Sequence, residues 1–190
     1  MKTAKTIVKA EQATAVDFGT FDKLNEYVLE LGPEVKISGK VFGGTLTGAT
    51  GGEFSFQSFA PGAETGFLHT HKNHEELYFF LKGQGEFQVD GQVFPVSEGS
   101  VVRVAPAGKR SVRNNGNEPL VMLCVQYRGN TFTAEDAADG VILNEKVLWK
   151  GCRGRTGLLV ERTEKSFGET YYWMFSLKRV SESMIRRLCR

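Results

Sequence analysis

The sequence predicts an all-β protein whose strands form a sandwich or a barrel, and three observations support this prediction. Between residues 53 and 127, short apolar or alternating segments recur, separated by Gly, Pro and Asn, which favour turns. Within that region, segment 53–59 alternates strictly between polar and aromatic residues, as expected of a half-buried strand. The pair Asp90-Gly91 separates two further short strands and favours a tight type I′ hairpin, because both residues tolerate positive φ.

The chain is long enough for one full core with additions, since it has 190 residues, of which 41% are hydrophobic. We expect residues 1–40 to form an N-terminal extension with one short helix that packs on the strands. The apolar residues of this helix recur at helical spacing between a cap and a stop signal: Phe21, Leu24, Val28 and Leu31 follow Thr20 and precede Gly32-Pro33. Residues 41–128 then hold the predicted strands.

All three histidines of the chain lie within segment 69–76, together with two adjacent glutamates. Thr70 separates His69 from His71, and side chains of an extended backbone alternate with period two, so both imidazoles project to one side. Two histidines and a carboxylate on one face, with coordination positions left open, are typical of non-haem iron and catalytic zinc sites. The sequence therefore predicts a divalent metal site here.

The wider segment resembles the first motif of the cupin superfamily, which runs glycine, His-x-His, glutamate and a closing glycine. The residues that fill it are Gly62, His69, His71, Glu76 and Gly83, with a first gap one residue longer than usual. Glu76 rather than Glu75 has the motif's spacing to the closing glycine, and it shares strand parity with Tyr78. The resemblance implies a double-stranded β-helix, the cupin-type jelly-roll barrel, over residues 41–128. It also implies a metal site at His69, His71 and Glu76 that binds iron, manganese, zinc or nickel.

The segment that contains Pro106-Ala107-Gly108 resembles the second cupin motif but departs from it at one position. The motif normally has a histidine three residues after Pro-x-Gly, and Ser111 stands there instead. A hydroxyl is a poor ligand for a divalent transition metal, so the family's fourth protein ligand is missing. Either water or His74 completes a metal shell, or the metal is lost and the same inward polar residues bind a small molecule. His74 lies where the chain turns, and polar residues in turns are usually solvated.

A basic side chain is also predicted to face the site. If the strand continues without a bulge, Arg113 shares parity with Ser111 and points toward the place of the missing histidine. A guanidinium binds a carboxylate in bidentate fashion, so Arg113, Ser111 and Tyr78 are candidate substrate-binding residues for an anionic ligand. The alternative for Arg113 is a surface salt bridge. We expect Lys109 and Arg110 to lie on a loop, in solvent.

The chain beyond residue 128 differs from the predicted barrel. We expect residues 129–149 to form a closing segment, an acidic loop followed by apolar residues that close the barrel or pack in a dimer. Residues 150–190 form a basic tail with ten Lys and Arg against four Glu, although the whole chain has a net charge of only +2. This composition predicts either a basic amphipathic helix, for a membrane surface or an acidic partner, or a weakly ordered extension.

Several classes of protein are disfavoured by the sequence. No apolar run is long enough to span a bilayer, and the first residues lack a signal-peptide pattern, so we expect a cytoplasmic protein. The three cysteines show neither paired nor zinc spacing, and no nucleic-acid-binding motif accompanies the strands.

A homodimer is expected, because segments 120–125 and 141–149 and the N-terminal extension offer more apolar surface than one barrel needs.

Two functional hypotheses remain open at this point. In the first, the protein is an enzyme in which the metal acts as a Lewis acid, or activates dioxygen if it is iron, on a small carboxylate-bearing or polyhydroxylated metabolite. The cupin resemblance includes oxygenases, isomerases, epimerases and decarboxylases and does not choose among them. In the second, the protein is a non-catalytic sensor or small-ligand binder with an aromatic pocket. The candidate lining residues are Phe54, Phe56, Phe59, Tyr78 and Phe80.

Overall fold

The computed structural model describes residues 2–30, 32, 36–147, 158–167 and 170–179. The chain divides into two compact units, Met1–Asp139 and Gly140–Arg190. The predicted strands and the predicted metal site all lie in the first unit.

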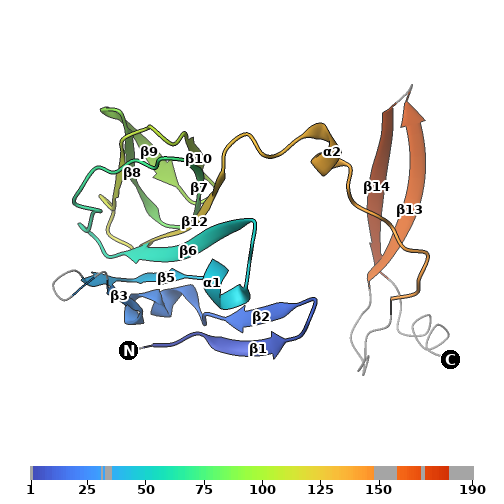
Figure 1. The fold of residues 1–190 in the computed structure, drawn as a ribbon, viewed down its shortest axis with the longest axis horizontal. Coiled ribbons are helices and arrows are strands. Elements are labelled where there is room, and N and C mark those ends of the chain that lie inside the picture. Colours follow the sequence, from blue (N-terminus) through green and yellow to red (C-terminus); the bar gives the residue numbers. More distant parts are fainter. Residues whose placement is uncertain (1, 31, 33–35, 148–157, 168–169, 180–190) are drawn as a thin grey trace. The chain divides into compact units, whose positions relative to one another are not determined.

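Two antiparallel sheets face each other in the first unit (Figure 1). The larger has the order β10-β7-β12-β6-β5, with strands β5 (Lys40–Phe42), β6 (Gly52–Phe59), β7 (His74–Lys82), β10 (Val101–Val104) and β12 (Leu120–Arg128). The smaller has the order β11-β8-β9, with strands β8 (Gln84–Val89), β9 (Gln92–Ser97) and β11 (Arg110–Arg113). The predicted all-β double-stranded β-helix is confirmed.

The main hydrophobic core lies between these sheets. Tyr78 and Phe80 of β7 pack on Phe87 of β8, with ring centroids 4.8 and 6.2 Å apart. Full burial of each such side chain contributes about 1.5–3 kcal/mol. The rest of this core is Phe59, Val96, Val104, Val112, Leu120, Met122 and Cys124. Strand β12 is therefore a central, buried strand, and the apolar segment 120–125 stabilises the barrel instead of forming free surface for a dimer.

Two local predictions about the strands are confirmed. Strand β6 covers the alternating segment 53–59. Strands β8 and β9 form a hairpin whose turn residues Asp90 and Gly91 have φ angles of 50° and 85°, as a type I′ turn requires.

The N-terminal helix is shorter than predicted and is a 3-10 helix, η1 (Phe21–Glu26). Val28 was expected on the same helix but lies in β3 (Val28–Glu30), which pairs with β4 (Lys36–Ser38). The strand pairing provides backbone hydrogen bonds and overrides a weak helical spacing. Leu31 lies outside the described residues.

The N-terminal segment packs on the outer face of the larger sheet, as expected. Leu24 and Tyr27 form a second buried cluster with Val121, flanked by Phe56 and Phe18. In Figure 1 these N-terminal elements, in blue, lie next to β5 and β6. The remaining elements there are the hairpin of β1 (Lys5–Lys9) and β2 (Thr14–Asp17), and the one-turn helix α1 (Gly44–Thr47).

The segment expected to be an acidic loop contains one helical turn, α2 (Ala134–Ala137). A capping box explains the difference, because the Thr133 hydroxyl accepts from the Asp136 N–H and the Asp136 carboxylate accepts from the Thr133 N–H. Beyond this helix, the apolar side chains of Val141, Ile142, Leu143 and Val147 are exposed.

The second unit contains an antiparallel hairpin of β13 (Leu158–Phe167) and β14 (Thr170–Arg179). Segment 171–177 is therefore a strand, and the amphipathic-helix alternative is wrong for that part of the tail. Residues 180–190 lie outside the described residues, as does Trp149. Among the described residues, no helix has the length and hydropathy of a membrane span.

Candidate metal and ligand site

The two histidines of the predicted site lie in the irregular segment that leads into β7, and backbone contacts hold this segment against the start of β11. The His71 N–H donates to the Pro106 carbonyl over 2.9 Å. His69 and Arg110 form an isolated antiparallel bridge, in which the Arg110 N–H donates to the His69 carbonyl over 3.1 Å. Glu76 follows on β7 and faces the barrel interior.

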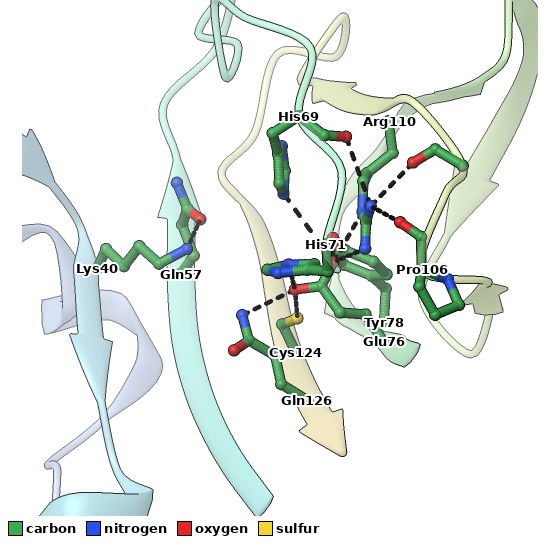
Figure 2. A network of polar contacts seen from close by, with 11 residues as sticks. Lys40, Gln57, His69, His71, Glu76, Tyr78, Pro106, Arg110, Cys124 and Gln126 are labelled. Atoms are coloured by element: carbon green, nitrogen blue, oxygen red, sulfur yellow. Dashed lines mark hydrogen bonds and ion pairs between the residues drawn. The ribbon is translucent and has the colours of Figure 1, made fainter. Parts of the chain in front are cut away.

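His69, His71 and Glu76 come together, with one ligand atom of each lying within 4.8 Å of the others (Figure 2). His71 Nε2 lies 3.1 Å from Glu76 Oε1, and His69 Nε2 lies 4.0 Å from Glu76 Oε2. The two imidazole rings are nearly perpendicular, at 88°, with centroids 5.6 Å apart. The predicted alternation of the backbone thus brings both rings to the carboxylate.

The donor set fits a divalent transition metal. Bonds of about 2.0–2.2 Å allow two ligands of one ion to be up to about 4.4 Å apart, so a small movement of these side chains would enclose an ion. Within the described residues, His71 Nε2 is buried and has no hydrogen-bond partner. His71 Nε2 is therefore close to the Glu76 carboxylate, at 3.1 Å, but is not oriented to form a hydrogen bond with it. A buried imidazole nitrogen without a hydrogen-bond partner is available to bind a metal.

Glu76 is the centre of a buried polar network (Figure 2). Its Oε2 accepts from the Arg110 Nε over 2.8 Å and from the Tyr78 hydroxyl. Its Oε1 accepts from the Gln126 amide over 2.8 Å and from the Cys124 thiol over 3.4 Å. These contacts fix the carboxylate at one position on the cavity wall.

The network sets the protonation states of the site. Burial alone would raise the pKa of Glu76, but the Tyr78 hydrogen bond and the charges of Arg110 and His71 outweigh it and hold this pKa at about 2. Burial and the Arg110 charge lower the pKa of His69, which favours the neutral imidazole that binds metals. Burial also raises the pKa of Tyr78, so its hydroxyl remains a donor.

Arg110 is the functional residue that the sequence interpretation missed. It was expected on a loop in solvent, but it is 1% exposed and begins β11. Its Nη2 lies 2.8 Å from Glu76 Oε2, and its Nη1 donates to the carbonyls of Gly108, Pro106 and His69. A buried arginine requires such partners, and Glu76 lies 34 residues away along the chain. In the sequence, one feature indicates that Arg110 points inward. It lies two residues before the apolar Val112 and would therefore share a strand face with it.

Arg113 does not face this site, and that prediction is wrong. Alternation along β11 directs Arg110 and Val112 inward, whereas Arg113 is on the outer face, in an exposed pair with Glu86 at 2.5 Å. The alternative of a surface salt bridge is confirmed. Ser111 lines the cavity but does not contact Glu76. The residue beside Glu76 on this strand is Arg110.

His74 and Glu75 lie outside the cluster. His74 is the first residue of β7 and is exposed, with its ring centroid 6.2 Å from that of His71. Glu75 points to the opposite face of β7 and forms an ion pair with Arg103. The choice of Glu76 over Glu75 by strand parity agrees with the structure.

A cavity of about 630 Å³ lies beside the cluster, within the range of about 300–1,000 Å³ usual for small-molecule sites. Of the aromatic residues considered for its lining, Phe59 and Tyr78 contribute to it. Phe54 and Phe56 are on the other face of β6 and pack around Phe18. The polar lining includes Lys40, Gln57, Gln126 and the residues of the cluster.

Comparisons with known proteins agree with this fold. Residues 55–126 match the family model described as a cupin domain. An uncharacterized protein of Methanocaldococcus jannaschii is 32% identical over 71 residues, 37% of this chain and 57% of that protein. An oxalate-binding protein of Thermotoga maritima is 33% identical over 72 residues, 38% of this chain and 59% of that protein. The chain thus spans less than two thirds of the length of either curated relative.

Among solved structures, a cupin protein from Bacteroides fragilis is similar to this chain with a TM-score of 0.53 and 28% identity. The similarity covers 60% of this chain and 99% of that one. The segment that matches the family model contains His69, His71, Glu76 and Arg110 but not Lys40.

Proposed function

The chain belongs to the cupin superfamily, and from this premise we propose that its barrel holds a divalent metal ion and binds a small anionic metabolite beside it. The observation that carries the proposal is the convergence of His69, His71 and Glu76 on the wall of a cavity. Two imidazole nitrogens and one carboxylate oxygen suit iron, manganese, zinc or nickel and leave coordination positions open. Such an ion supplies Lewis acidity toward a carbonyl or enolate oxygen.

The protein's own side chains favour an anionic ligand. Arg110 and Lys40 bring positive charge to the cavity, and Glu76 is the buried carboxylate that faces them. Phe59 and Tyr78 cover the inner walls, which reduces the water that would screen a bound anion. The oxalate-binding relative from Thermotoga maritima supports this ligand class. We propose oxygenation, isomerisation or decarboxylation of a small acid as the fitting reactions.

A second candidate function is that of a metal-free binding or sensor protein. The observation that favours it is the Arg110–Glu76 pair, because the guanidinium already neutralises the carboxylate that a metal would use. In this version the cavity and its basic residues bind the same class of anion, without metal-dependent chemistry.

Elemental analysis of protein purified without added metal distinguishes the two candidates. Metal-stripped protein is then titrated with Mn²⁺, Fe²⁺, Ni²⁺ and Zn²⁺ by calorimetry, with His71→Ala as the test variant and Glu75→Ala as its matched control. One equivalent of metal in the wild type and in Glu75→Ala, but not in His71→Ala, supports the metal-dependent function. Protein that takes up no metal yet binds small carboxylates supports the sensor. Protein that binds neither contradicts both.

A further inference from the structure

We propose that Lys40 binds a second acidic group of the ligand, so that the ligand is a small dianionic metabolite held between Lys40 and the His69/His71/Glu76 cluster. This inference deepens the proposed ligand-binding function and assumes it. It assigns a chemical class to the ligand and a specificity role to a residue that precedes the segment matched by the family model.

Strand register places Lys40 on the inner face of the larger sheet. Lys40 of β5 is opposite Gln57 of β6, and Gln57 is in turn opposite Met122 of β12. Met122 is opposite Phe80 of β7, which is four residues after Glu76 and therefore on the same face of that strand. Directly opposed residues share a face, so Lys40 and Glu76 point to the same side of the sheet. Both line the 630 Å³ cavity.

The ammonium of Lys40 has no carboxylate partner among the described residues. Its contacts are a 3.3 Å hydrogen bond to the Gln57 amide oxygen and the ring of Phe42, whose centroid is 5.5 Å away. Figure 2 shows the Lys40 side chain extended to Gln57, with the His71 and Gln126 groups beyond it. Burial lowers the pKa of Lys40, and the charge of Glu76 opposes this effect, which indicates that the ammonium lies within electrostatic range of the cluster. The Lys40 side chain is half-buried, and a lysine drawn from solvent in this way usually has an acidic partner.

The other charged side chains on the rim of the cavity, Lys36 and Glu64, do not form an ion pair with Lys40. Lys36 also lines the cavity, but it is exposed and pairs with Glu30 at 3.0 Å. Glu64 lines the cavity as an exposed residue and forms no ion pair among the described contacts. Because the Arg110 guanidinium is already paired with Glu76, a cavity that holds a metal has two separate cationic positions for a ligand, the metal at the His69/His71/Glu76 cluster and Lys40. An acid with a single charged group satisfies only one of them, and a dianion satisfies both through charge-assisted hydrogen bonds.

Calorimetry with matched pairs of acids tests the proposal. The probes are malonate against propionate and succinate against butyrate, which differ in one carboxylate, each measured on metal-loaded and metal-stripped protein. In the wild type, at least one dicarboxylate should bind about tenfold or more tightly than its matched monoacid, equivalent to about 1.4 kcal/mol. Lys40→Met should abolish this preference and Lys40→Arg should retain part of it. Lys82→Met, which removes an exposed lysine paired with Asp22, should leave it unchanged.

The results of these titrations distinguish failure of the Lys40 proposal from failure of the proposed function. A wild-type protein that binds both acids of each pair equally overturns the role of Lys40, as does a Lys40→Met variant that keeps the preference. If metal titration is normal in those experiments, the proposed function still stands. If the wild type binds neither metal nor any acid, both proposals fail. Thermal denaturation verifies folding, and Lys40→Gln provides a second neutral variant if the methionine disturbs the packing.

Discussion

Arg110 and Glu76 form an ion pair in which both side chains are buried, with the Arg110 Nε and Nη2 each 2.8 Å from Glu76 Oε2. The pair joins β11 of the smaller sheet to β7 of the larger one, at the wall of the cavity. Desolvation of two buried charges offsets most of their attraction, so the pair adds little net stability. Its effect is to fix the carboxylate that faces His71.

Removal of Arg110 from this ion pair should lower the stability of the protein. Arg110→Met leaves Glu76 buried without its cation, and we expect the metal-free protein to lose roughly 3–5 kcal/mol of unfolding free energy. Added Mn²⁺ should restore more stability to this variant than to the wild type, because the ion supplies the missing positive charge and binds only the folded state. Urea denaturation with and without Mn²⁺ measures both effects. A variant as stable as the wild type without metal would contradict the role assigned to the pair.

The missing fourth ligand of the cupin motif can be tested by a pair of histidine substitutions. Because Arg110 is the β11 residue beside Glu76, Arg110→His should add an imidazole to the cluster and tighten metal binding by about tenfold or more. Ser111→His, the substitution that the motif spacing suggests, should have a smaller effect, since strand alternation directs residue 111 away from Glu76. Calorimetric titration with Ni²⁺ ranks the two. The reverse ranking would show that the motif spacing, and not the strand, defines the ligand position.

Substitutions at and around the proposed metal ligands should differ clearly in their effect on metal content. His71→Ala and Glu76→Ala each remove a donor atom and should eliminate most bound metal. Glu75→Ala should change little, because its carboxylate pairs with Arg103 on the other face of β7. His74→Ala should also change little, because that side chain is exposed and outside the cluster. Metal content after dialysis, with circular dichroism as the folding control, provides the comparison, and loss of metal in Glu75→Ala alone would refute the assigned register.

The parts of this molecule that could be predicted from the sequence are those set by local rules. The alternation in segment 53–59 and the Asp90-Gly91 turn follow from backbone geometry, and the structure has both. The His-x-His spacing and the parity of Glu76 likewise gave the three residues that converge.

The features that escaped prediction depend on partners distant in sequence. Arg110 adjoins a turn and is basic, which favours solvent, and only its pairing with Glu76 accounts for its burial. Lys40 was assigned to the end of an extension because its neighbour on β6, Gln57, is 17 residues away. Val28 joined β3 because pairing with Ser38 outweighed its helical spacing.

A homodimer remains our expectation, and of the apolar surfaces considered for it we test the N-terminal extension. Segment 120–125 is buried, whereas β1 presents the exposed side chains of Ile7 and Val8. A two-stranded hairpin alone is marginally stable, so burial of β1 against a second copy would stabilise it. Light scattering should give the mass of a dimer for the wild type and a smaller mass for Ile7→Asp. Val93→Asp, at an exposed valine of β9, is the control, and a monomeric wild type at micromolar concentration would defeat the expectation.

The low pKa of Glu76 predicts a specific dependence of stability on pH. In the folded protein this pKa is about 2, against an ordinary value of 4.5, so the folded state binds the proton more weakly than the unfolded state does. The contribution of the ionised carboxylate is therefore complete above about pH 4.5 and is lost as the pH falls toward 2, with a total of roughly 3 kcal/mol. Glu76→Gln cannot titrate, yet its amide oxygen can still accept from Arg110. For metal-stripped proteins, the difference in unfolding free energy between wild type and Glu76→Gln should narrow steadily as the pH falls below 4.5, a range in which the neighbouring histidines are already protonated in both proteins. A difference that stays constant between pH 4.5 and pH 3 would mean that Glu76 is not held ionised by Tyr78 and Arg110.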